Sequence, residues 1–350
     1  MRRLLLLLVL LLSFAPESHA RRRAATPPSA FLNVAAIDRI GLSALDSGIP
    51  GITIAIRKDN VSFTRAYGTT GVDTVYQIAS LTKQFTAAAT LRLAEQGKLR
   101  LDDRVRTWIP ELDARFDTIT VAHLLSHTSG LREYAEYVED FYAPMSQQQL
   151  LTLIGRPPML FAPGASFWYS NANYYLLGVI LERASSKTYE QLLRDLFFEP
   201  LGLRDTSYCG TKGPVPEGFF VDARGIVAPE RAVDMSLFYA AGALCSTAYD
   251  LVRWNTALVD GTAMTKESYT LMTTPAKTTF PQNVDYGFGL LMTTLDGRPM
   301  IWHDGQLPGF QTHLGWHPDD ELTVAVLINT YHPSRDLATE IAAEIARALR

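Results

Sequence analysis

A serine and a lysine three residues apart, Ser80 and Lys83, are the side chains of this sequence best suited to nucleophilic chemistry. They lie at the start of a predicted helix that runs to Gly97, and residues three apart share a helix face. Free N–H groups and the helix dipole at this end can stabilise an oxyanion. A partly desolvated lysine beside the hydroxyl can act as a base. Alone the pattern is weak, because about one chance match is expected in a chain this long.

Two further motifs supply groups that fit beside this pair. Tyr169 and Asn171 precede a strongly helical stretch. Next to a lysine ammonium, the Tyr169 hydroxyl would ionise more easily and relay protons, while the Asn171 amide can hold both the lysine and a substrate carbonyl. His303 and Gly305 lie at the end of a predicted strand, where a glycine lets a substrate backbone approach the edge. Considered singly, such a tyrosine or histidine is more often structural.

In this order the three motifs resemble those of the serine β-lactamase and penicillin-binding-protein superfamily, on the class C side. The resemblance covers the chain from about residue 33 to residue 345. It extends to the flanks of the motifs, which are residues 99–103, 124–131, 174–178 and 199–203.

The resemblance implies a role for each motif residue. Ser80 would be the nucleophile that forms an acyl-enzyme, and Lys83 and Tyr169 would take and return the proton. Asn171, His303, Gly305 and Gln306 would bind the substrate, with the backbone N–H groups of Ser80 and Gln306 forming the oxyanion hole.

One departure from the family pattern concerns His303, where the well-known β-lactamases and transpeptidases carry lysine. A lysine is charged at neutral pH and attracts a substrate carboxylate, whereas histidine is mostly neutral. We therefore expect weak β-lactam hydrolysis at most, and an esterase, D-amino-acid peptidase or DD-carboxypeptidase-like activity instead. Two alternatives are a penicillin-binding or sensor protein that acylates without turnover and a non-catalytic interaction protein, which an intact motif set disfavours.

The order of predicted elements indicates an α+β fold, in which one antiparallel sheet is built from both ends of the chain and covered by the first and last helices. Residues 31–77 and 283–350 would form this α/β part, and residues 78–282, with no β period of any length, a mainly helical insertion. Predicted helices cover residues 31–45, 120–125, 146–154, 172–184 and 189–197. Predicted strands cover residues 52–56, 61–63, 286–293, 299–303, 311–317 and 322–329. Ser334 would cap a last helix with an apolar stripe at Leu337, Ile341, Ile345 and Leu349.

The first residues have the pattern of an export signal. Residues 1–20 combine two arginines, a leucine-rich run and a Ser-His-Ala end, which predicts a secretory signal peptide and a periplasmic or secreted protein. Residues 21–30 would be a flexible lead-in. No later apolar run is long enough to span a membrane.

The formal net charge of −4, without a basic stripe, argues against binding of nucleic acid. We expect a monomer that acts on a small molecule or peptide without a cofactor.

The cysteines and histidines do not cluster as a metal site. Cys209 and Cys245 are compatible with a disulfide in an oxidising compartment or with two buried thiols, and the sequence leaves both open. His123 and His127 have a spacing that could ligate zinc on a helix, but no third ligand is evident and a structural role is favoured. His313 and His317 fall in a predicted strand, where this spacing does not bring them together.

Overall fold

The structure is a computed structural model that describes residues 33–222, 224–280 and 283–350, so the predicted signal peptide and lead-in lie outside the described residues. The strands are β1 (Gly51–Lys58), β2 (Val61–Gly68), β3 (Tyr76–Gln77), β4 (Ser207–Tyr208), β5 (Gly218–Val221), β6 (Val227–Glu230), β7 (Leu244–Ser246), β8 (Asp285–Tyr286), β9 (Leu291–Leu295), β10 (Arg298–Leu307), β11 (Phe310–His317), β12 (Leu322–Ile328) and β13 (Thr330–Tyr331). The helices are α1 (Val34–Asp46), α2 (Thr82–Glu95), α3 (Val105–Trp108), α4 (Val121–Leu125), α5 (Gln147–Gly155), α6 (Asn171–Ser185), α7 (Tyr189–Leu193), α8 (Tyr239–Gly242), α9 (Ala248–Val259), α10 (Lys266–Met272) and α11 (Leu337–Ala348). A 3₁₀ turn, η1 (Ala79–Leu81), leads into α2.

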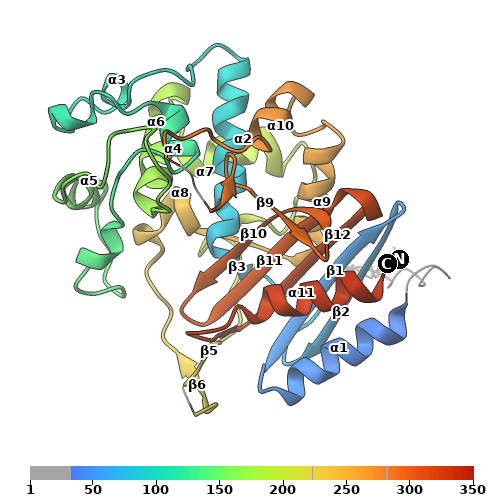
Figure 1. The fold of residues 1–350 in the computed structure, drawn as a ribbon. Coiled ribbons are helices and arrows are strands. Elements are labelled where there is room, and N and C mark those ends of the chain that lie inside the picture. The colour runs from blue at the N-terminus through green and yellow to red at the C-terminus, as the bar shows by residue number, and fades with distance from the viewer. Residues whose placement is uncertain (1–32, 223, 281–282) are drawn as a thin grey trace, which may run out of the picture.

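The main sheet joins the two ends of the described chain, as the sequence predicts. Its order is β2-β1-β12-β11-β10-β9-β8, and neighbouring strands are antiparallel (Figure 1). The first hairpin turns at Asp59 and Asn60, which both have positive φ. This is the conformation of a type I′ turn, whose twist matches that of the strands it joins. The N-terminal hairpin thereby adds to the C-terminal meander through β12.

The first and last helices cover one face of this sheet (Figure 1). Alternate residues of β1 and β12 point into this layer, where they are fully buried against α1 and α11. The apolar stripe predicted for the last helix is buried in the same cluster, at Leu337, Ile341, Ile345 and Leu349. The cap prediction was wrong, because Asp336 rather than Ser334 accepts the hydrogen bond from the Thr339 N–H (3.2 Å).

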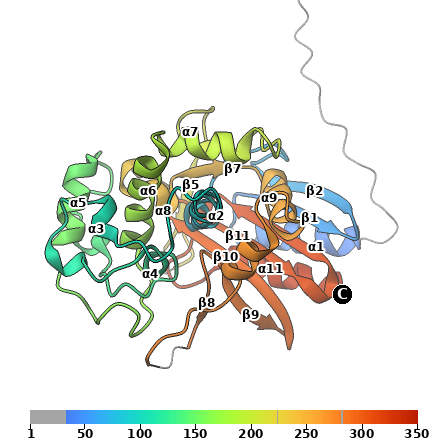
Figure 2. The same cartoon turned by 90° about the horizontal axis from the view of Figure 1, so that it is seen from above.

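The opposite face of the sheet carries the larger, helical part of the protein. The view from above places α2 at the centre, with α6, α7 and α9 around it (Figure 2). Because α2 is enclosed, all of its residues from Thr82 to Leu91 are buried, including polar ones. The helix that follows Ser80 is therefore a central and rigid element of the fold.

The segment 78–282 is mainly helical but contains strands that the sequence did not predict. Strands β4, β5, β6 and β7 are only two to four residues long, too short to show a period-two pattern. Strand β7 pairs with β3 and β4, and β5 pairs with β6 and, in parallel, with β13. These small sheets tie the helical part to the two ends of the chain.

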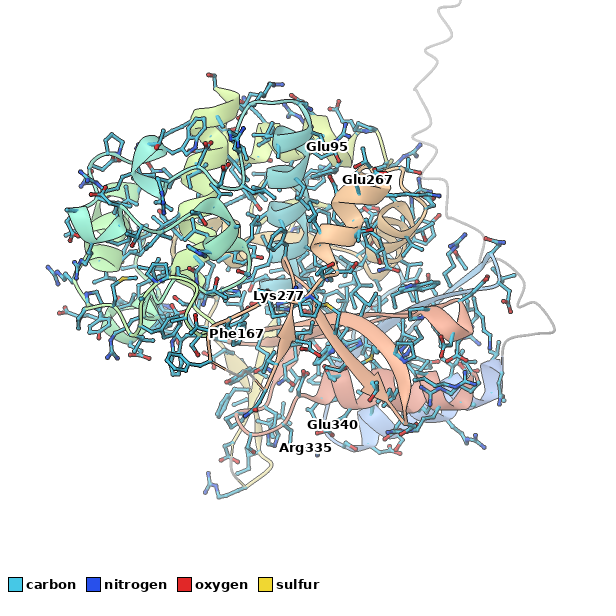
Figure 3. The ribbon with its side chains drawn as sticks, turned by 45° about the horizontal axis from the view of Figure 1, so that its top comes forward. Glu95, Phe167, Glu267, Lys277, Arg335 and Glu340 are labelled. Carbon is cyan, nitrogen blue, oxygen red and sulfur yellow. A yellow bond between two sulfur atoms is a disulfide. The ribbon has the colours of Figure 1, made fainter. Side chains whose placement is uncertain are left out.

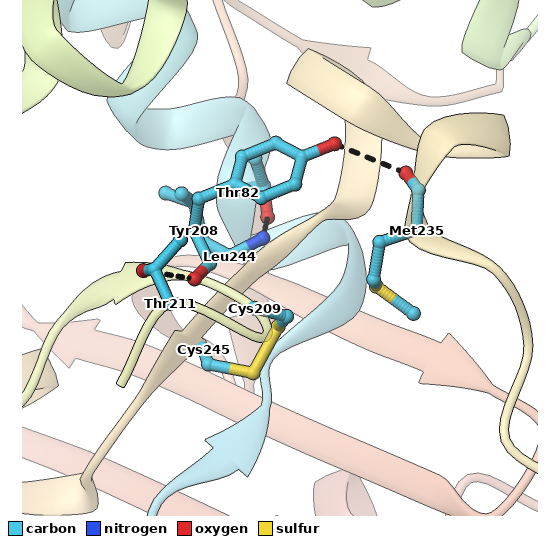
Figure 4. Close-up of a disulfide and its surroundings, with 7 residues drawn as sticks. All are labelled: Thr82, Tyr208, Cys209, Thr211, Met235, Leu244 and Cys245. Carbon is cyan, nitrogen blue, oxygen red and sulfur yellow. Dashed lines mark hydrogen bonds between the residues drawn. A yellow bond between two sulfur atoms is a disulfide. The ribbon is translucent and has the colours of Figure 1, made fainter. Parts of the chain in front are cut away.

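Cys209 and Cys245 form a disulfide (Figure 4). Cys245 lies on β7 and pairs with Gln77 of β3. Gln77 precedes Ser80 by three residues. The neighbouring N–H of Leu244 donates to the Thr82 hydroxyl (3.1 Å), as Figure 4 shows. The disulfide therefore reinforces β7, the strand that holds the start of α2 in place.

No helix in residues 33–222, 224–280 and 283–350 has the length and apolarity to cross a membrane.

Candidate active site

Ser80 lies in η1, a turn that strands on two sides hold in place. Ile78 donates its N–H to the carbonyl of Leu244 (3.0 Å), and the Ile78 carbonyl accepts a hydrogen bond from the Thr312 hydroxyl (3.0 Å). Ala79 has a left-handed backbone with φ of 48°. This conformation costs a non-glycine residue about 1–3 kcal/mol and persists only where the surroundings enforce it. The strained turn presents the Ser80 side chain to the cavity described below.

Lys83 is completely buried beneath this turn, and its amine has three hydrogen-bond partners. Its Nζ lies 3.0 Å from Ser80 Oγ, 2.8 Å from Asn171 Oδ1 and 2.8 Å from the carbonyl of Ala241. Desolvation lowers the pKa of Lys83 to about 7, although the nearby carboxylates of Glu133 and Asp304 oppose the shift. A substantial fraction of the amine is therefore neutral at neutral pH.

The arrangement around Lys83 directs the lone pair of the neutral amine. The Ala241 carbonyl and Asn171 Oδ1 can only accept hydrogen bonds, so they take the two protons of a neutral amine. The remaining lone pair then points to Ser80 Oγ, the third partner. Neutral Lys83 is thus oriented to receive the hydroxyl proton of Ser80.

Tyr169 completes the group, because its hydroxyl lies 3.0 Å from Ser80 Oγ. The Lys83 Nζ lies 4.9 Å from the centre of the tyrosine ring. Desolvation raises the pKa of Tyr169 well above its usual value, and its hydrogen bond with Ser80 opposes this only in part. The expectation that the neighbouring lysine eases ionisation of Tyr169 was therefore wrong. Tyr169 is a protonated phenol that donates to Ser80, while Lys83 is the group with the pKa of a base.

Asn171 is the first residue of α6, and the backbone there is fixed. Ser170 caps the helix by accepting from the N–H of Ala172 (3.2 Å), and the Asn171 N–H donates to Glu133 Oε2 (2.6 Å). Because Lys83 occupies Asn171 Oδ1, the Asn171 amide nitrogen is the part of this side chain left to contact a substrate.

His303 is buried and is bound at both ring nitrogens. Its Nδ1 lies 2.6 Å from the carbonyl of Asp304, and its Nε2 lies 3.2 Å from the Tyr286 hydroxyl. Because a carbonyl only accepts, Nδ1 carries the proton and Nε2 accepts from the tyrosine. Burial lowers the pKa of His303 below its usual value. The position at which the family pattern has a lysine therefore carries an imidazole that favours its neutral form.

Gly305 permits a close contact between β10 and the turn that carries Ser80. A Cβ atom there would lie 2.4 Å from the Ile78 carbonyl oxygen and 2.3 Å from Thr312 Oγ1. Packing therefore requires a glycine at this position, in addition to the access for a substrate that the sequence led us to expect. Gln306, the next residue along β10, is exposed and lines the cavity.

A cavity of about 440 Å³ opens over Ser80, and it contains most of the predicted site residues. One part is apolar, formed by Phe167 (Figure 3), Val284 and Leu291. The other lining residues carry polar groups and are Ser80, Tyr169, Asn171, Tyr286, His303, Asp304 and Gln306. Distant segments of the chain therefore meet at one cleft between the helical part and β10.

Several residues of this site were missed in the sequence. Phe167 and Asp304 lie next to motif residues, so proximity in the sequence was a usable signal. The carbonyl of Ala241 gave none, because every residue has a carbonyl and only the tertiary fold selects this one.

His127 has the structural role that the sequence favoured, and it packs against the catalytic tyrosine. Its ring stacks on that of Tyr169, its carbonyl accepts from the N–H of Trp168 (2.9 Å), and its Nδ1 accepts from the N–H of Ser170 (3.2 Å). His127 therefore contacts three consecutive residues, Trp168, Tyr169 and Ser170. It lies beyond the end of α4, so it does not share a helix face with His123.

No three histidine, cysteine, aspartate or glutamate side chains of the described residues are placed to hold a metal ion.

The chain is similar to known proteins over most of its length. A family model described as Beta-lactamase matches residues 24–348. The chain is 28% identical over 281 residues to Penicillin-binding protein 4* of Bacillus subtilis (strain 168), which covers 73% of this chain and 61% of that protein. It is 26% identical over 312 residues to a D-aminopeptidase of Gluconobacter oxydans (strain 621H), with 84% and 58% covered. The chain thus spans about three fifths of the length of these curated relatives.

A solved structure matches over a larger share of its own length. The D-amino acid amidase from Ochrobactrum anthropi SV3, complexed with L-phenylalanine, superposes with a TM-score of 0.81 at 25% identity. The match covers 90% of this chain and 98% of that one. The shared architecture therefore includes both the sheet and the helical part.

Proposed function

The chain belongs to the Beta-lactamase family, and from this premise we propose that it is a secreted serine hydrolase that cleaves amides of D-amino acids through an acyl-enzyme on Ser80. The observation that carries the proposal is that Lys83 Nζ and the Tyr169 hydroxyl each lie 3.0 Å from Ser80 Oγ. The choice of a D-amino acid amide is supported by the D-aminopeptidase and the D-amino acid amidase among the similar proteins.

In the acylation step, neutral Lys83 takes the proton of the Ser80 hydroxyl while Oγ attacks the amide carbonyl carbon. The oxyanion that forms is stabilised by the backbone N–H groups of Ser80 and Gln306, in the arrangement that the family resemblance implies. Tyr169 gives its proton to the leaving nitrogen and regains one from Lys83, so the C–N bond breaks and an ester to Ser80 remains. Water then attacks this ester, with the same groups removing its proton and restoring the serine.

The cavity supports an acyl group with an apolar side chain. Phe167, Val284 and Leu291 offer apolar contact next to the reactive serine. Neutral His303 offers no cation for the carboxylate of a β-lactam. We therefore propose little or no β-lactam hydrolysis, and nitrocefin turnover at rates typical of resistance enzymes would contradict this part.

The direct test compares the wild type with the variants Ser80→Ala and Lys83→Met. D-phenylalaninamide and L-phenylalaninamide serve as substrates, with ammonia release as the measurement. We expect turnover of the D-amide by the wild type alone and a mass increase on Ser80 when the reaction is quenched. Equal ammonia release by the wild type and Ser80→Ala would refute the hydrolase.

A second candidate function is a penicillin-binding protein that is acylated without turnover, which the similarity to Penicillin-binding protein 4* supports. Stoichiometric labelling of Ser80 by fluorescent penicillin, without release over hours and without amide turnover, would favour it over the hydrolase.

Export remains part of the proposal and rests on the pattern of residues 1–20. The disulfide between Cys209 and Cys245 is consistent with an oxidising compartment. Expression of the full chain in a bacterium, followed by fractionation and N-terminal sequencing, tests it. We expect a periplasmic or secreted protein that begins at Arg21, and recovery of the uncleaved chain from the cytoplasm would contradict export.

A further inference from the structure

We propose that Asp304 forms an ammonium subsite, which binds the free α-amino group of the substrate and sets a preference for unblocked amines. The inference rests on the proposed function, since it concerns how a substrate lies in the same cavity. Its starting point is that Asp304 contributes a carboxylate to the lining of the cavity that contains Ser80.

The charge of the cavity favours a cation. Among the described residues that line it, Asp304 is the only one with a carboxylate, and none is a lysine or arginine. His303 could supply a positive charge, but it is buried and its Nδ1 proton is already donated to the carbonyl of Asp304. A substrate carboxylate would therefore meet a negative group, while a protonated amine would be attracted.

The Asp304 carboxylate has one oxygen available. Its Oδ2 accepts from Gln306 Nε2 (3.2 Å). Its Oδ1 lies 3.7 Å from His303 Nδ1, beyond hydrogen-bond distance, and has no hydrogen-bond donor within the described residues. The side chain is only 27% exposed, so water covers it incompletely. An ammonium group would provide the missing donor in a charge-assisted hydrogen bond.

Asp304 is also close enough to act on the reacting groups. Its charge raises the pKa of both Lys83 and Tyr169, the two residues hydrogen-bonded to Ser80 Oγ. In an amino acid amide the α-amine is one carbon away from the carbonyl that Ser80 attacks. A carboxylate beside this centre is placed to hold the amine while the side chain occupies the apolar part of the cavity.

The experiment measures binding without turnover, in the Ser80→Ala background. Affinities for D-phenylalaninamide and for N-acetyl-D-phenylalaninamide are determined by calorimetry with and without Asp304→Asn, a change that keeps the size of the side chain. Asp285→Asn serves as the matched control, because Asp285 is exposed near the cavity but does not line it.

We expect Asp304→Asn to weaken binding of the free amine at least tenfold, to change binding of the acetylated amide by less than twofold, and Asp285→Asn to affect neither. The subsite would be overturned if Asp304→Asn weakened binding of both ligands equally or of neither. It would also be overturned if the protein with Asp304 intact bound the free amine no more tightly than the acetylated amide. Turnover of D-phenylalaninamide by the protein with Ser80 intact is measured separately. Binding preference without turnover refutes the proposed function alone, and turnover without an effect of Asp304→Asn refutes the subsite alone.

Discussion

The ring of His127 stacks on the ring of Tyr169, with centroids 4.4 Å apart and planes inclined by 29°. The hydroxyl of this tyrosine is the one that contacts Ser80 Oγ. The ring of Tyr286 packs edge-on with that of His127, and their centroids are 4.9 Å apart. Desolvation lowers the pKa of His127 well below its usual value, so the ring is neutral. The histidine therefore positions the phenol without placing a charge beneath it.

The first prediction concerns His127→Asn. Asparagine tolerates the left-handed backbone of this position, where φ is 56°, and its oxygen can accept the Ser170 N–H, but it offers no ring to Tyr169. We expect kcat to fall by about tenfold to a hundredfold, with KM nearly unchanged, because loss of position affects the transition state most.

The readout for His127→Asn is steady-state kinetics on a D-amino acid amide, with thermal unfolding measured in parallel. Tyr169→Phe is the matched comparison, since it removes the hydroxyl and keeps the stack. If kcat stays at the wild-type level while the protein remains folded, His127 does not position the catalytic tyrosine.

The second prediction is the pH dependence that Lys83 imposes. The base must be neutral, and its pKa is lowered to about 7, so kcat/KM should rise with pH up to about 7 and level off above. Burial lowers the pKa values of both His127 and His303, which favours their neutral forms.

A pH profile from 5 to 9 tests this prediction, with Ser80-dependent ester hydrolysis as the signal. Asp304→Asn removes a carboxylate that raises the pKa of Lys83, so the rising limb should move to lower pH in this variant. A profile that is flat between pH 5 and pH 9 would exclude Lys83 as the base.

The sequence predicts the motif residues of the site and misses those that reach it only through tertiary packing. The spacing of Ser80 and Lys83 puts them on one helical turn, and the family resemblance adds Tyr169, Asn171 and His303 from distant segments. The carbonyl of Ala241 and the ring of His127 reach the site only through tertiary packing, and no local pattern marks them. The same holds for the fold, since the long strands with alternating apolar residues were predictable and the two-residue strands β3 and β4 were not.

The third prediction concerns Gly305→Ala, which forces a methyl group against the turn that carries Ser80. The nearest atoms would be 2.3 and 2.4 Å away, one of them a backbone oxygen that cannot move freely. We expect a loss of about 1–3 kcal/mol in unfolding free energy and about a hundredfold in kcat/KM, because the turn must shift. Gly155→Ala is the control, since a Cβ there meets no atom within 4 Å. Equal behaviour of both variants would contradict the packing role.

The fourth prediction concerns the disulfide. Cys209 and Cys245 are 36 residues apart, and closing such a loop stabilises a protein by up to about 4 kcal/mol. Cys209→Ser with Cys245→Ser should lower the unfolding free energy by this order. Activity at 25 °C should be largely kept, because the Ile78 and Thr82 hydrogen bonds to Leu244 do not depend on the sulfurs. Urea unfolding with and without a reducing agent measures the effect, and an unchanged midpoint would argue against it.

The last prediction concerns Asp336, which caps α11 through Thr339. Burial raises its pKa to about 6, above that of an aspartate in the unfolded chain, so the folded state binds the proton more tightly. The resulting stabilisation is present below about pH 4 and is lost as the pH rises through about 6. Asp336→Asn keeps a side chain that caps helices well and removes the buried charge. The variant should therefore be more stable than the wild type by up to about 3 kcal/mol at pH 8 and equally stable at pH 4. Thermal unfolding at both pH values decides this, and a variant that is less stable at pH 8 would show that the charged form of Asp336 is favoured in the fold.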